Sequence, residues 1–185
     1  MTTKSIVTKK RIDVKRLVTM AVLAAVSIVL VILIHFPIFP AVFFLEYDPA
    51  DIPILLGTFM FGPLHGILLT IVVSVIQGLT VSSGSGLYGI IMHVIATSAY
   101  VLVSGLIYKY RHTLGGAIIA LIAGMAAMVA IMIPANLVIT PLFMGGAVIP
   151  YLGYIVAFNA VKAGLNGVVT FIVYKPLRKV LKLGK

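Results

Sequence analysis

Long apolar runs, separated by charged residues or by residues rich in glycine and proline, dominate the chain. An α-helix rises about 1.5 Å per residue, so about 20 apolar residues cross the hydrocarbon core of a bilayer, which is about 30 Å thick. Prolines bound these runs: Pro37 follows the first, and Lys175 with Pro176 stops the last. The runs of sufficient length predict membrane-spanning helices at Leu17–Phe36, Tyr88–Tyr108, Ala117–Phe143 and Tyr151–Tyr174.

The stretch Ile52–Thr80 is also apolar, but as one helix it would be about 43 Å long, too long without strong tilt. Gly62 and Pro63 form a turn signal near its middle. The pattern therefore predicts two shorter helices, Asp51–Phe61 and Leu64–Thr80. The first is short for a full span, so we expect it to pack partly against other helices rather than against lipid.

The basic residues decide between five spans and six. With six, both ends of the chain and the loop at Lys109 and Arg111 share one side, which then holds every lysine and arginine except Lys162. Basic loops stay on the cytoplasmic side, so six spans with both termini cytoplasmic are favoured. We predict an all-α, multi-pass protein of the cell membrane with one membrane domain, 1–185. Its parts are a basic segment 1–16, a six-helix bundle 17–175 and a basic tail 176–185.

The composition agrees with a membrane protein and excludes several other classes. Hydrophobic residues make up 62% of the chain and charged residues 10%, against about 45–50% and about 25% in soluble domains. The net charge of +10 follows from the flanks of the spans and does not indicate nucleic acid. There is no cysteine, no phosphate-binding GxxxxGK[ST] loop and no HExxH or GxSxG motif. The histidines have no metal-ligand spacing, so we expect no enzyme, no metal and no cofactor.

Polar residues inside the predicted spans mark a candidate binding site, because such groups are costly in a bilayer. Lys162 lies about 17 Å from the outer end of the last helix. Asn159 shares its helix face, and Asn136 of the fifth helix lies at a similar depth. Gln77 and His93 also lie in the outer halves of their spans. Amides donate and accept hydrogen bonds and an ammonium only donates, so the set predicts an outward-facing pocket for a neutral, flat ligand.

Structural alternatives stay open for these residues. For Gln77 and His93, hydrogen bonding between helices is the favoured alternative. Lys162 also fits an ion pair with an acid of the first outer loop. That loop holds three of the four acids of the chain, Glu46, Asp48 and Asp51. Its residues 39–47 are suited to form walls or a lid, and the lack of a carboxylate deep in any span weakens a proton-coupled carrier.

Small residues in the first helix predict a close helix contact. Ala21 and Ala25 are four residues apart in its cytoplasmic half, and such spacing lets another helix approach closely. Packing within the bundle is an equal alternative. The fifth helix carries rival pairs, Ala120 with Gly124 and Ala123 with Ala127.

The run Phe44–Pro53, followed by Leu55, Leu56 and Gly57, resembles the first outer loop and second helix of riboflavin-type S-components. These are subunits of energy-coupling factor (ECF) transporters that import vitamins. The resemblance extends over nearly the whole chain: six spans, a basic N-terminus, an alanine-rich first helix and an Asn-x-x-Lys motif in the last helix.

The resemblance implies a membrane subunit that captures riboflavin from outside and works with a transmembrane coupling subunit and two ATPases. Alanines placed like Ala21 and Ala25 contact the coupling subunit in that family. Positions matching Asn136, Asn159 and Lys162 hydrogen-bond the flavin ring. Leu45 and Tyr47 resemble further contacts, and Gln77 completes the predicted substrate site. Asn166 has no role in this resemblance.

Two other functions remain as alternatives. One is an S-component for a different vitamin or a nucleobase-like solute. The other is a self-contained secondary carrier that uses Lys162 as its coupling group.

Overall fold

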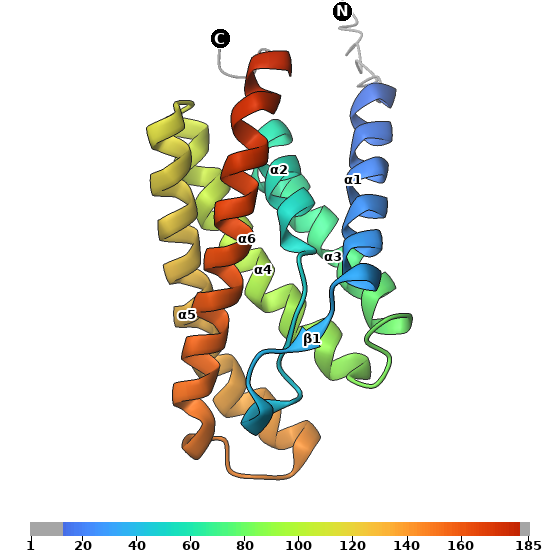
Figure 1. Cartoon of the computed structure of the whole chain (residues 1–185), viewed down its shortest axis with the longest axis vertical. Helices are drawn as coiled ribbons and strands as arrows, with labels where there is room; N and C mark the ends of the chain where they lie inside the picture. Colours follow the sequence, from blue (N-terminus) through green and yellow to red (C-terminus); the bar gives the residue numbers. More distant parts are fainter. Residues whose placement is uncertain (1–12, 182–185) are drawn as a thin grey trace, which may run out of the picture.

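The computed structural model describes residues 13–181, and these form an all-α bundle with one very short pair of strands. The helices are α1 (Val14–Leu33), α2 (Asp51–Phe61), α3 (Pro63–Leu79), α4 (Gly86–Tyr110), α5 (Leu114–Met144) and α6 (Leu152–Leu181). Among the described helices, α1, α4, α5 and α6 are long and apolar enough to cross a membrane, whereas α2 and α3 are shorter apolar helices. The start of α1, the α2–α3 and α4–α5 junctions and the end of α6 lie at one end of the bundle (Figure 1).

The first helix begins and ends three residues earlier than predicted. Asp13 caps it by accepting a hydrogen bond from the Arg16 N–H at 3.2 Å, so the helix starts at Val14. It ends at Leu33, three residues before Phe36, which Pro37 restricts to an extended conformation. Residues Phe36–Pro37 form strand β1, which pairs antiparallel with β2 (Glu46–Tyr47). The loop between these strands contains a 3₁₀ turn, η1 (Pro40–Val42).

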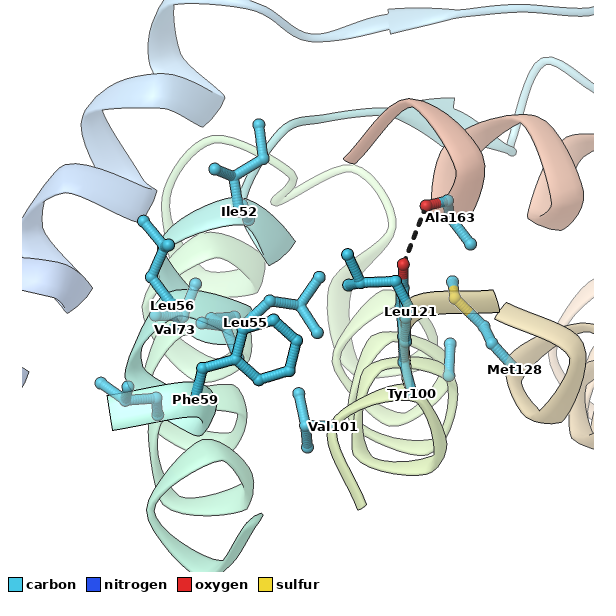
Figure 2. Close-up of a cluster of buried hydrophobic side chains, with 14 of the residues drawn as sticks. Ile52, Leu55, Leu56, Phe59, Val73, Tyr100, Val101, Leu121, Met128 and Ala163 are labelled. Carbon is cyan, nitrogen blue, oxygen red and sulfur yellow. Dashed lines mark hydrogen bonds between the residues drawn. The ribbon is translucent and has the colours of Figure 1, made fainter. Parts of the chain in front are cut away.

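The break between α2 and α3 lies where the sequence predicts it. Gly62 has φ 94°, a conformation that side-chain-bearing residues rarely adopt, and Pro63 opens the next helix. Every residue of α2 from Asp51 to Phe59 is buried, so the prediction that this helix packs against other helices is confirmed. In Figure 2, its side chains Ile52, Leu55, Leu56 and Phe59 contribute to the apolar cluster.

The last helix corrects one prediction. Lys175 and Pro176 do not stop it, because α6 continues to Leu181 with Pro176 inside. Pro176 is exposed, and the helix tolerates both the missing N–H of this proline and the crowding of its ring against the carbonyl four residues earlier. Two further prolines, Pro134 and Pro141, lie inside α5, which is continuous over 31 residues. A 3₁₀ turn, η2 (Ile149–Tyr151), links α5 to α6.

Helices α4, α5 and α6 pack closely against one another in the core. A Cβ added at Gly124 would lie 2.5 Å from Cδ2 of Tyr100, so only glycine allows this contact. The Tyr100 hydroxyl donates to the Ala163 carbonyl at 3.1 Å, which ties α4 to α6 (Figure 2). Ala120 is fully buried as well. The pair Ala120 and Gly124 therefore serves packing inside the bundle.

Candidate functional site

A cavity lies in the half of the bundle that also holds the α1–α2 loop and the α3–α4 connection. Its open space, including the part continuous with solvent, is about 710 Å³. Helices α3, α4, α5 and α6 and the loop all contribute side chains. The polar lining residues are His35, Glu46, Asp48, Ser74, Gln77, Ser82, Ser85, His93, Asn159 and Lys162. The apolar and aromatic walls include Phe44, Leu45, Tyr88, Met92, Ala96, Met128, Met132 and Phe158.

An ion pair crosses the wall of this cavity. Lys162 Nζ lies 2.8 Å from Asp48 Oδ2, and the two residues are 6% and 3% exposed. Gln77 Nε2 donates to the same oxygen at 3.1 Å, and the Ala50 N–H donates to Asp48 Oδ1 at 3.1 Å. Burial raises the pKa of the Asp48 carboxyl, but the attraction of the Lys162 ammonium, its hydrogen bond and the nearby His93 together hold that pKa below its usual value. This contact is the ion pair with a loop acid that the sequence left open for Lys162.

The second buried acid, Asp51, lies at the start of α2. Its Oδ1 accepts from the Thr97 hydroxyl at 2.7 Å and is 3.2 Å from His93 Nε2. The other nitrogen of His93 is 3.1 Å from the Ser74 hydroxyl, so His93 links α2, α3 and α4. This is the structural alternative considered for His93. The sequence places both acids in the first outer loop, and the folded loop carries Asp48 and Asp51 inward to buried partners on α6 and α4.

Asn166 of α6 fastens this part of the loop, a role that the sequence did not reveal. Its Oδ1 accepts from the Tyr47 hydroxyl at 3.0 Å. Its Nδ2 donates to the backbone carbonyl of Asp48 at 3.1 Å and to Asp51 Oδ2 at 3.2 Å. The available signal was its spacing of seven residues from Asn159, which places both on nearly one helix face.

The predicted site residues are all buried, but they are not all in the cavity wall. Leu45, Gln77, Asn159 and Lys162 line it, whereas Tyr47 and Asn136 are not among the lining residues. Asn159 Nδ2 donates to the Ile155 carbonyl at 2.8 Å.

Asn136 is occupied within its own helix. Its Nδ2 donates to the Met132 carbonyl at 2.8 Å, and its Oδ1 accepts from the Thr140 hydroxyl at 3.0 Å. The Thr140 hydroxyl lies 3.0 Å from that of Tyr88. Asn136 therefore reaches the cavity indirectly, since Met132 and Tyr88 both line it.

A contact between His35 and Glu46 borders the mouth of the cavity. His35 Nε2 lies 2.9 Å from Glu46 Oε2 and 3.3 Å from the Ser82 hydroxyl. These three residues also line an outer hollow, together with Phe43 and Phe143. Because His35 follows α1 and Ser82 follows α3, the contact joins two connections to the strand β2. Among residues 13–181, no cluster of histidine, aspartate and glutamate side chains is arranged to hold a metal ion.

The two alanines predicted to meet a partner face outward. Ala21 and Ala25 are exposed on α1, whereas Ala24 between them is buried against the bundle. The Arg16 guanidinium lies 5.8 Å from the Phe61 ring centroid, so this end of α1 also contacts the end of α2.

Known proteins resemble this chain over most of its length. The profile of the family described as "ECF transporter, substrate-specific component" matches residues 15–174. The riboflavin transporter FmnP of Bacillus subtilis (strain 168) is 30% identical over 68% of this chain and 66% of its own length. The riboflavin transporter RibU of Staphylococcus aureus (strain TCH60) is 29% identical over 91% of this chain and 93% of its own. A solved structure titled "Structure and mechanism of the S component of a bacterial ECF transporter" superposes with a TM-score of 0.83. It is 30% identical and covers 92% of this chain and 99% of its own.

Proposed function

The chain belongs to the family of substrate-specific components (S-components) of ECF transporters, and we propose that it captures riboflavin from outside the cell for uptake. The members of this family are transport subunits and not enzymes. The observation that carries the proposal is the cavity, where the polar groups of Gln77, Asn159 and Lys162 stand among apolar and aromatic walls. Such a lining suits a flat, uncharged ring with several hydrogen-bonding atoms. The names of the similar transporters support riboflavin as that ligand.

The proposal includes an orientation in the membrane. All six helices cross the cell membrane as one membrane domain, 1–185, and both termini are cytoplasmic. The basic residues Lys15, Lys109 and Lys175 support this orientation, because they lie at one end of the bundle, opposite the cavity mouth at His35 and Ser82. The short α2 is enclosed by the other helices rather than by lipid.

The energy for uptake comes from partners. The chain has no GxxxxGK[ST] nucleotide-binding loop. Two ATPase subunits would hydrolyse ATP, and a transmembrane coupling subunit would use that energy to drive release of the ligand inward. The exposed small-residue face of α1, at Ala21 and Ala25, is the proposed contact for the coupling subunit. The contact needs small residues, because they allow the backbones of two helices to approach closely.

Riboflavin binding is the direct test. The purified protein is expected to carry a yellow, fluorescent ligand, and added riboflavin is expected to raise its thermal unfolding temperature. A panel of other vitamins and nucleobases is the control. A folded protein stabilised by another member of the panel, and not by riboflavin, would assign a different substrate. Uptake by the chain alone in liposomes under an ion gradient would instead indicate a secondary carrier.

The α1 face makes a separate prediction. Replacing both Ala21 and Ala25 by leucine is expected to lower ATP-dependent uptake at least about tenfold, because overpacking a helix contact costs about 1–3 kcal/mol. Riboflavin affinity should stay unchanged, since neither residue lines the cavity. The matched control replaces Ala126 and Ala130, also exposed and four residues apart, on α5. Equal uptake by both double variants would contradict the assignment of this face.

A further inference from the structure

Gln77 is held by one end of its amide. It lies on α3, is 7% exposed and lines the cavity. Its Nε2 is 3.1 Å from Asp48 Oδ2 and 3.4 Å from the Ser82 hydroxyl. A carboxylate only accepts hydrogen bonds, so the group that faces Asp48 must be the NH₂. The carboxylate thereby decides which end of the amide is oxygen, an assignment that shape alone leaves open.

The other end of this amide has no partner. Three side-chain atoms in the described part of the chain are buried without a hydrogen bond: Gln77 Oε1, Ser98 Oγ and Thr170 Oγ1. Of these residues, Gln77 alone lines the cavity. A buried carbonyl without a donor costs about 1–3 kcal/mol, so native proteins keep such groups where a partner arrives.

Lys162, beside Gln77, provides hydrogen-bond donors where Gln77 provides an acceptor. An ammonium has three N–H donors, and Lys162 donates one of them to Asp48 at 2.8 Å. Lys162 and Gln77 therefore meet at the same oxygen, Asp48 Oδ2. The cavity presents donors from Lys162 beside an acceptor from Gln77. A ligand edge with a carbonyl next to an N–H matches this pair.

We propose that Gln77 is a specificity-determining residue, whose Oε1 accepts a hydrogen bond from an N–H group of the ligand that lies beside a carbonyl. This inference rests on the proposed function. Riboflavin has one ring N–H, in an imide flanked by two carbonyls. Asp48 acts as the positioning residue for both contacts, because its oxygen orients the Gln77 amide and the Lys162 ammonium.

The test compares riboflavin with its analogue methylated at the imide nitrogen, which cannot donate. In the unmodified protein, methylation is expected to weaken binding about 10- to 100-fold, the effect of one buried hydrogen bond. In Gln77→Leu the same methylation should change affinity less than about threefold. Gln77→Met keeps the length of the side chain and replaces Gln77→Leu if that variant fails to fold. Met132→Leu, an apolar change in the same cavity wall, should keep the full penalty.

The ratio of the affinities for riboflavin and for its methylated analogue tests the contact, whereas the affinity for riboflavin alone also reports structural damage. A structural defect caused by loss of the contact with Asp48 would weaken the binding of both ligands equally. An unchanged methylation penalty in Gln77→Leu or Gln77→Met overturns the inference, as does the absence of a penalty in the unmodified protein. Lumiflavin, which keeps the imide but lacks the ribityl hydroxyls, should show the same loss from the Gln77 change as riboflavin. A loss with riboflavin alone would assign Oε1 to a hydroxyl and overturn the N–H contact. If the folded, unmodified protein binds no flavin, the proposed function itself fails.

Discussion

Replacing Lys162 by methionine is expected to destabilise the protein by about 3–5 kcal/mol, because the Asp48 carboxylate would remain buried without its counter-ion. The pair is 2.8 Å apart and nearly enclosed, and Gln77 offers Asp48 only a neutral donor. Thermal unfolding in detergent measures the loss. Lys109→Met, which removes an exposed lysine from the end of α4, is the control and should change stability by less than about 0.5 kcal/mol.

A double variant separates the two roles considered for Lys162. Asp48→Asn together with Lys162→Met removes both charges and should restore stability to within about 1–2 kcal/mol of the unmodified protein. Riboflavin affinity should nevertheless stay at least tenfold lower, because the ammonium donors to the ligand are gone. Isothermal titration or fluorescence quenching measures it. If the double variant bound riboflavin as tightly as the unmodified protein, the ion pair would be structural only.

Local signals in the sequence were sufficient for the order and type of the helices. Gly62 and Pro63 marked the break between α2 and α3, because a positive φ and a missing N–H act within one turn. The same local rule failed at Pro176, where the helix continues. A proline ends a helix only if the lost hydrogen bond and the bulk of its ring are not tolerated, and that depends on the surroundings.

The candidate site was predictable only in part. Burial of Asn159 and Lys162 followed from their place in an apolar span, and both line the cavity. The partner of Lys162 is 114 residues away, and no spacing rule connects two such positions. The distribution of charges along the sequence places Asp48 in an outer loop. Only the folded structure shows that this loop enters the bundle, where Asp48 meets α6 and Asp51 meets α4.

Asn166→Leu is expected to lower the free energy of unfolding by about 2–4 kcal/mol. The Asn166 side chain makes hydrogen bonds to three residues of the segment 47–51, which enters the bundle. The substitution removes the acceptor of the Tyr47 hydroxyl and the donors to the Asp48 carbonyl and the Asp51 carboxylate. All three groups are buried, and each unpaired polar group costs about 1–3 kcal/mol, partly relieved by local shifts.

Thr170→Val is the matched control for this change. Thr170 lies one turn further along α6 and is fully buried, and its hydroxyl has no partner in the described part of the chain. Because no hydrogen bond is lost, this isosteric change should alter stability by less than about 1 kcal/mol. Thermal unfolding compares the two variants directly, and equal stability would show that Asn166 does not fasten the loop.

Asn166→Leu is also expected to change the kinetics of riboflavin binding. Leu45 and Asp48, which belong to the loop that Asn166 fastens, line the cavity, so loosening the loop should release riboflavin faster. Stopped-flow fluorescence should give a dissociation rate at least about tenfold higher in Asn166→Leu, with a smaller change in the association rate. A normal dissociation rate in a destabilised Asn166→Leu protein would mean that the segment 47–51 is an anchor for folding alone. The expected lid would then be residues 39–45, whereas the hydrogen bonds of Asn166 are to Tyr47, Asp48 and Asp51.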